Sequence, residues 1–330
     1  MAGTAVTHRG AGPLPPVPTR RPTRRPTRRP ARRARRGRDP RWATLAWLGP
    51  AVLLILGVVV YPVIALVRAS FERYSLTGLS KGPAGTGNYQ AVLGHPALGG
   101  VLTNTAVWVL TVVASTLLVG LAVAQLLSKE FAGRRLVRWA LIVPWAASLV
   151  ITAQLFTLLY DYYHGIVNTV LLRLGVVDTP VDFLGDDRWA MPSMILVGVF
   201  VSVPFTVYVL LAGLNSIPGE VYEAARMDGA GAWRTYRAIT LPLLRPAVLV
   251  ATLLNVIYVF NSFPIVYTLT NRSPGFVHDT SITFMYKLAF RSAERDVGMS
   301  AAAGVCNVLL ILVVVAIYLR LVKWGEEQPS

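Results

Sequence analysis

The chain has a single cysteine, Cys306, and only four histidines in 330 residues. One thiol cannot form an internal disulfide, and this one lies within an apolar run. The histidines (His8, His95, His164 and His278) lack the spacing of a metal site, so no metal or other cofactor is predicted. The sequence contains no G-x-x-x-x-G-K-[ST] phosphate loop and no Ser–His–Asp set. It is therefore not predicted to be an ATPase or another enzyme, and no catalytic residue is assigned.

Charge is nearly absent from six long apolar segments. Each is close to the roughly 20 residues that a bilayer requires, and 54% of the chain is hydrophobic. The segments are Leu45–Val67, Val101–Leu127, Val137–Tyr160, Ser193–Leu214, Ala247–Thr270 and Ala301–Leu321. Apart from Arg138 and Arg320 near two segment ends, none contains Asp, Glu, Lys or Arg. Ion-coupled carriers normally mark their pathways with ionisable groups, so a proton-coupled carrier is disfavoured. The predicted fold class is an all-α polytopic membrane protein with six transmembrane helices.

Basic residues between these segments are distributed unequally. The side that carries the N-terminal tail, the 128–136 loop with Arg138, the 216–246 loop and the C-terminus holds 23 of the 32 Lys and Arg, against 9 on the other side. Since positive loops remain in the cytoplasm, both termini and the 216–246 loop are predicted to be cytoplasmic. The protein is expected to be a multi-pass membrane component.

Residues 1–42 form an arginine-rich tail that contains the repeat RRPT-RRPT-RRPA. Frequent proline and self-repelling arginines predict disorder. A nucleic-acid tether, as in a membrane scaffold, is one interpretation. Because an apolar span follows at once, attraction to anionic membrane lipid is favoured, and no nucleic-acid partner is predicted. The membrane domain is placed at 43–324, followed by a short cytoplasmic tail at 325–330.

The polar stretch 216–246, SIPGEVYEAARMDGAGAWRTYRAITLPLLRP, lies between the fourth and fifth apolar segments. Pro218 suits a first helical turn, which Glu220 and Glu223 would follow. Gly229 and Gly231 are expected to break this helix. A second amphipathic piece is predicted from Ala232 to Ile239, and Leu241-Pro242 is expected to end it.

This stretch resembles the EAA loop of bacterial ABC importer permeases, in which E-A-A is followed by three residues, Gly, nine residues and I-x-L-P. Both spacings are kept here, and the surrounding residues are similar to the carbohydrate-importer branch. In that family the loop docks as a coupling helix into the ATP-hydrolysing subunit. The resemblance thus implies a type I importer permease fold and places coupling residues at Glu223, Ala224, Ala225, Asp228, Gly229, Ile239, Leu241 and Pro242.

The apolar segments also offer groups suited to a neutral, hydroxylated solute. Hydroxyls and amides bind sugar hydroxyls, and aromatic rings cover the C–H face. Asn255 and Tyr258 are offered by the fifth segment, and Pro144, Pro204 and Pro264 are expected to interrupt helices near the pathway. By similarity to maltose-type permeases, candidate pathway residues are Trp145, Ser148, Ser202, Phe205, Asn261 and Ser262. Gly198 and Val259 replace that subfamily's sugar-facing amides. For each polar residue, packing between helices is the alternative.

The resemblance implies a carbohydrate importer permease, or alternatively one for glycerol-3-phosphate or a polyol. The partners implied are a second homologous permease, two copies of an ATP-binding subunit and an extracytoplasmic solute-binding protein that delivers a sugar. A non-ABC membrane scaffold is the more distant alternative.

Overall fold

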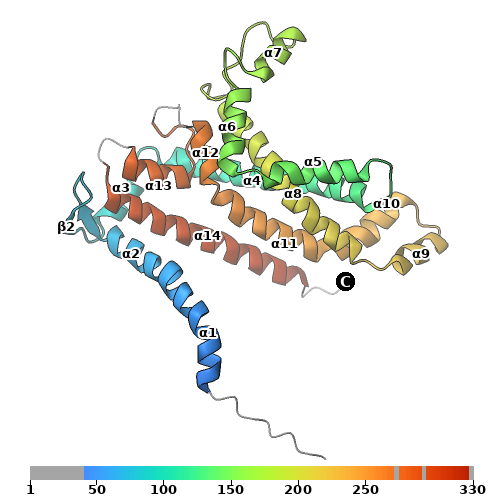
Figure 1. Cartoon of the computed structure of the whole chain (residues 1–330), viewed down its shortest axis with the longest axis horizontal. Helices are drawn as coiled ribbons and strands as arrows, with labels where there is room; N and C mark the ends of the chain where they lie inside the picture. The colour runs from blue at the N-terminus through green and yellow to red at the C-terminus, as the bar shows by residue number, and fades with distance from the viewer. Residues whose placement is uncertain (1–40, 271–274, 292–294, 327–330) are drawn as a thin grey trace, which may run out of the picture. The chain divides into compact units, whose positions relative to one another are not determined.

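The computed structural model describes residues 41–270, 275–291 and 295–326, so most of the arginine-rich tail lies outside the described residues. Helices dominate these residues (Figure 1). They are α1 (Arg41–Ile55), the π-helix η1 (Leu56–Val60), α2 (Tyr61–Ser70), α3 (Gly87–Leu93), α4 (Leu98–Ser128), α5 (Arg134–Ala146), α6 (Leu149–Leu159), α7 (Ile166–Arg173), α8 (Ala190–Asn215), α9 (Gly219–Met227), α10 (Ala232–Thr235), the π-helix η2 (Tyr236–Thr240), α11 (Leu241–Phe260), α12 (Phe263–Thr270), α13 (Ser281–Phe290) and α14 (Val297–Glu326).

Five helical stretches in the described part of the chain are long and apolar enough to cross a membrane: Trp47–Ser70, Leu98–Ser128, Ala190–Asn215, Ala232–Phe260 and Val297–Val322. Four of them confirm expected segments, whereas the fifth expected segment, Ala247–Thr270, is covered only as far as Phe260 and continues after a break as α12. The segment Val137–Tyr160 is instead divided between α5 and α6, and neither half reaches the length of a single span. The contacts within the chain divide it into two units, with the boundary after Leu54. The unit from Ile55 onward contains all the sites considered below.

The effects of proline differ from the expectation at one of three positions. α5 ends two residues after Pro144, and α12 begins one residue before Pro264. α8, however, runs through Pro204 without a break. Much of α8 is buried against α4 and α11. That packing holds the helix through the one backbone hydrogen bond that the proline removes.

Two details depart from a purely helical six-span plan. The loop after α2 forms an antiparallel hairpin of β1 (Glu72–Tyr74) and β2 (Ser80–Pro83), which an all-α prediction missed. The last helix also extends to Glu326, so residues expected in the short C-terminal tail continue the helix. The loops between the apolar segments also carry short helices, namely α3, α7, α9, α10 and α13.

The core is centred on α4 and α8, which pack more extensively on each other than any other pair of elements. Trp108 of α4 is buried there, and its indole Nε1–H donates to the Val259 carbonyl at 3.0 Å. Its ring also occupies the space beside Gly198, where an added Cβ would lie 2.6 Å from the ring. Gly198 and Val259, the two positions where the maltose-type amides are replaced, are therefore core positions in this chain.

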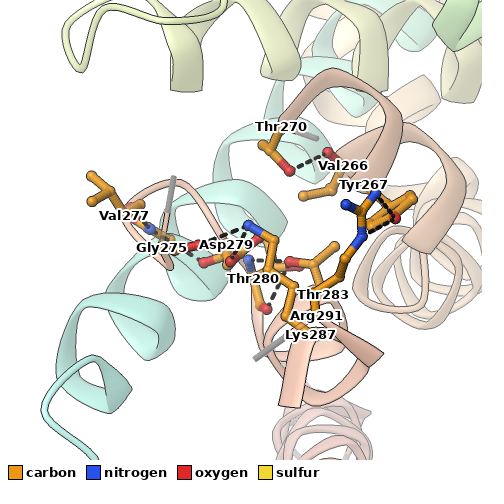
Figure 2. Close-up of polar contacts among 11 residues, drawn as sticks. Val266, Tyr267, Thr270, Gly275, Val277, Asp279, Thr280, Thr283, Lys287 and Arg291 are labelled. Carbon is orange, nitrogen blue, oxygen red and sulfur yellow. Dashed lines mark hydrogen bonds and ion pairs between the residues drawn. The ribbon is translucent and has the colours of Figure 1, made fainter. Parts of the chain in front are cut away.

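A buried polar cluster fixes residues 275–280, the described segment directly before α13 (Figure 2). The Asp279 carboxylate lies 2.8 Å from the Lys287 ammonium, which also donates to the Gly275 carbonyl at 2.8 Å. Asn104 of α4 donates to the Val277 carbonyl at 2.7 Å and the Asp279 carbonyl at 3.2 Å. Burial raises the pKa of the Asp279 carboxyl above its ordinary value, against the lowering influence of Lys287. These contacts join the segment to both α4 and α13.

Candidate functional site: a surface helix and an aromatic cavity

The polar stretch after α8 forms a surface helix, α9. Pro218 is its N-cap, with φ −60° and ψ 138°, so the proline stands just before the helix. Glu220 lies in the first turn, where the exposed N–H groups favour a negative charge. Arg226 lies in the last turn, where the opposite end of the dipole favours a positive one. The charge pattern therefore matches the direction of the helix.

Gly229 ends α9 with a φ of +73°. Its N–H donates to the Arg226 carbonyl at 3.0 Å, and the Ala230 N–H donates to the Ala225 carbonyl at 2.9 Å. This pair of bonds is the Schellman motif, in which glycine supplies the left-handed residue. Gly231 has an extended conformation and is the N-cap of α10. The predicted helix–glycine break–helix arrangement is thus confirmed.

The predicted coupling residues differ in exposure. Ala225 is buried, Ile239 and Leu241 are half-buried, and the remaining five (Glu223, Ala224, Asp228, Gly229 and Pro242) are exposed. Two large apolar side chains that the motif did not single out, Met227 and Trp233, are 88% and 72% exposed. Both side chains are therefore available for contact with another molecule. We call residues 219–240 the coupling segment.

Leu241-Pro242 does not end the second helical piece, contrary to the sequence prediction. α10, η2 and α11 form one helical stretch from Ala232 to Phe260. Pro242 lies about three turns into it. The Leu241 N–H donates back to the Tyr236 carbonyl in the five-residue spacing of a π-helix. This wider turn accommodates the proline without breaking the helical stretch. The coupling segment is consequently continuous with a candidate membrane span.

A cavity of about 380 Å³ lies between α5, α8 and α11. Trp145, Ser202 and Phe205, three of the six candidate pathway residues, line it together with Tyr258 and Asn255. Among the described residues, its wall contains three aromatic rings and no carboxylate or amine. Rings, hydroxyls and an amide are the groups that bind a neutral polyhydroxylated molecule. Tyr258 was noted in the sequence but was left out of the six candidates. Because it lines this cavity, we add it to the candidate pathway residues.

Asn255 is held by two hydrogen bonds between helices and within α11. Its side-chain N–H groups donate to the Thr206 hydroxyl and the Ala251 carbonyl, both at 2.8 Å. The residue is buried and therefore joins α11 to α8. Its oxygen is the atom that remains for a ligand in the cavity.

The other three candidate residues lie at breaks in the helices. Ser148 is extended between α5 and α6, with φ −62° and ψ 139°. Asn261 and Ser262 separate α11 from α12, and the buried Ser262 hydroxyl has no hydrogen-bond partner among the described residues. The two halves that follow these breaks, α6 and α12, pack against each other. Ser148, Asn261 and Ser262 do not line the aromatic cavity.

Taken together, the spanning helices, the two interrupted helices and the uncharged cavity define a membrane permease. Residues 116–324 match the family described as binding-protein-dependent transport system inner membrane component, and the chain belongs to this family of ABC importer permeases. The match includes the coupling segment and both helix breaks.

Individual relatives cover nearly the whole length of the chain. It is 33% identical to the sulfoquinovosyl glycerol transport system permease protein SmoG of Agrobacterium fabrum, over 86% of this chain and 94% of the relative. It is 32% identical to the trehalose/maltose transport system permease protein MalF of Thermococcus litoralis, over 84% and 92%. A crystal structure of a bacterial alginate ABC transporter, in complex with an alginate pentasaccharide-bound periplasmic protein, contains a chain with a TM-score of 0.71 and 23% identity, covering 88% of this chain and 96% of that one. That structural likeness shows a shared fold.

Proposed function

We propose that this permease forms half of the translocation pathway of an ATP-driven carbohydrate importer. The observation that carries the proposal is the aromatic, uncharged cavity, which matches a di- or oligosaccharide better than an anion. The names of SmoG and MalF, which refer to glycosylated or disaccharide solutes, support it. A permease for glycerol-3-phosphate fits less well, because none of the described residues that line the cavity is a Lys or Arg that could bind a phosphate. A polyol importer is the second candidate, since a polyol needs the same hydroxyl-binding groups.

The proposed topology has six spans, with α5 and α6 together forming the third and both termini in the cytoplasm. Support comes from the charge asymmetry of the loops. The arginine-rich residues 1–42 would then adjoin anionic lipid at the cytoplasmic surface. The complete importer would contain a second homologous permease, two ATP-binding subunits that carry out hydrolysis and an extracytoplasmic solute-binding protein.

In this assembly the coupling segment would dock on an ATP-binding subunit through its exposed acidic and apolar residues. Movement of the segment would pass directly into α11, because the helix runs without a break from Ala232 to Phe260. α11 supplies Tyr258 to the cavity wall, and it ends at the break beside Asn261. A rigid connection of this kind would change the cavity's access when the ATPase closes. As in any two-state system, the ligands set the populations through different affinities for the two states.

The proposal is tested by ATP hydrolysis in nanodiscs. The chain is purified with the subunits encoded beside it, the solute-binding protein is added, and a panel of sugars and polyols is screened. We expect one class of carbohydrate to stimulate hydrolysis and Glu223→Lys to abolish that stimulation, since it reverses an exposed charge on α9. If no ATPase co-purifies, the importer proposal is wrong. It is also wrong if uptake, measured in cells, continues after ATP depletion but stops with an uncoupler.

The cavity itself is tested by removing its rings. Trp145→Ala and Tyr258→Ala should each lower sugar-stimulated hydrolysis at limiting sugar about tenfold, as expected for about 1.4 kcal/mol of lost ring and hydroxyl contact. Trp139→Ala is the matched control, because Trp139 lies on the same helix as Trp145, is similarly exposed (58% against 54%) and is outside the cavity. Equal losses in Trp139→Ala and Trp145→Ala would show that the cavity does not bind the sugar.

A further inference from the structure

A second cavity is lined largely by the coupling segment, and the transport scheme above assigns it no ligand. Its volume is about 410 Å³. Its wall combines residues from the C-terminal end of α4, from α9, and from α10 and η2. Pockets of this size are typical of small-molecule sites. The cavity is distinct from the aromatic one, because the two share no lining residue.

The wall of this cavity is basic. Lys129, directly after α4, and Arg226, in the last turn of α9, bring two positive charges to it from different elements. No Asp or Glu is among the described residues that line it, although Glu130 and Glu223 are close to them in sequence. The two positive charges therefore meet no carboxylate within the wall itself.

Hydroxyl groups complete the wall. Tyr222 and Arg226 lie one turn apart on α9, and Ser128, Thr235 and Tyr236 also line the cavity. Guanidinium, ammonium and hydroxyl donors converging on one space form the typical environment of a phosphate group. We propose that this cavity binds a small phosphate-bearing anion, whose phosphate connects Arg226 on α9 to Lys129 at the end of α4.

The position of the cavity suggests what the anion does. The Tyr222 and Thr240 hydroxyls, 3.4 Å apart, already connect α9 to the far end of η2, and both residues line the cavity. Tyr236 and Thr240 are the first and last residues of this π-helix, a feature often found at functional sites. A bound anion would hold α9 against α4 and so restrain the coupling segment. This regulatory consequence rests on the proposed coupling function, whereas the binding itself does not.

Binding is measured directly on the full chain in phosphatidylcholine nanodiscs, by equilibrium dialysis with radiolabelled inorganic phosphate and pyrophosphate. We expect saturable binding that is at least tenfold weaker in Lys129→Gln/Arg226→Gln. Arg234→Gln is the matched control, because Arg234 is exposed on the neighbouring α10 and does not line the cavity. Replacing part of the lipid with phosphatidylglycerol distinguishes the source: competition with the soluble anion identifies a lipid headgroup, and unchanged binding identifies a free phosphate compound.

No saturable binding in either lipid, equal binding by the double variant, or an equal loss in Arg234→Gln would each overturn the proposal. Because this assay contains no ATPase and no sugar, its failure leaves the carbohydrate-import proposal intact. Conversely, failure of sugar to stimulate hydrolysis leaves the anion site intact. If binding is found, adding pyrophosphate to the assembled importer should lower sugar-stimulated hydrolysis in the wild type but not in the double variant, and no difference would overturn the regulatory role.

Discussion

Gly229→Val is expected to abolish sugar-stimulated ATP hydrolysis while leaving the permease in the membrane. The residue has a φ of +73°, which costs a side-chain-bearing residue about 1–2 kcal/mol and a β-branched one more. The Schellman bonds at Gly229 and Ala230 would be lost with that conformation. Since an added Cβ meets no described atom within 4 Å, the effect arises from backbone strain, and the core is unaffected.

Gly231→Ala provides the matched control for this prediction. Gly231 lies two residues further on, with φ −67° and ψ 161°, a conformation open to any residue. We expect this variant to retain nearly full stimulation, and Gly229→Ala to fall between the two. The amounts of permease and co-purified ATPase show whether assembly survives. A Gly229→Val transporter that assembles and responds to sugar like the wild type would remove the coupling role from this turn.

The coupling segment was largely predictable from the sequence. Two closely spaced glycines in a short polar stretch predict a break in the helix there, because glycine is unfavourable inside a helix. The positive φ of Gly229 confirms this prediction. The long apolar segments were predictable for the same reason: length and the absence of charge are local properties. The effect of Pro242 was not, because whether a proline ends a helix depends on whether the preceding turn can widen, as η2 does.

The solute pathway was harder to predict because it depends on which face of each helix meets its neighbours. Gly198 and Val259 are buried beside Trp108, a contact between residues about 90 and 150 positions apart in sequence, which no local pattern reveals. Tyr258, one residue before Val259, faces the cavity instead. Two consecutive residues of α11 thus face different surroundings, the cavity for Tyr258 and the core for Val259. The division of Val137–Tyr160 into α5 and α6 was likewise hidden, since both halves are apolar.

Lys287→Met is expected to destabilise the chain by about 3–5 kcal/mol near neutral pH, because it leaves the buried Asp279 carboxylate without its positive partner. Methionine has a similar length, so little packing is lost. Burial already raises the pKa of the Asp279 carboxyl, and loss of Lys287 removes a lowering influence, so the pKa rises further in the variant. The folded variant therefore takes up a proton at Asp279 more readily than the unfolded chain does.

The sign of the pH dependence follows from that difference. Below the unfolded pKa of Asp279 the carboxyl is neutral in both states, and the penalty for an unpaired charge disappears; it returns as the pH rises through the raised folded pKa. The stability deficit of Lys287→Met, measured as the difference in thermal unfolding midpoint from the wild type in nanodiscs, should thus shrink as the medium is acidified. Asp279→Asn/Lys287→Met should recover much of the loss at neutral pH and show no such trend. His278, whose charge also lowers the pKa of the Asp279 carboxyl, is kept in every variant. A deficit of the same size at all pH values would show that Lys287 stabilises the fold through its bond to the Gly275 carbonyl, with no contribution from its charge.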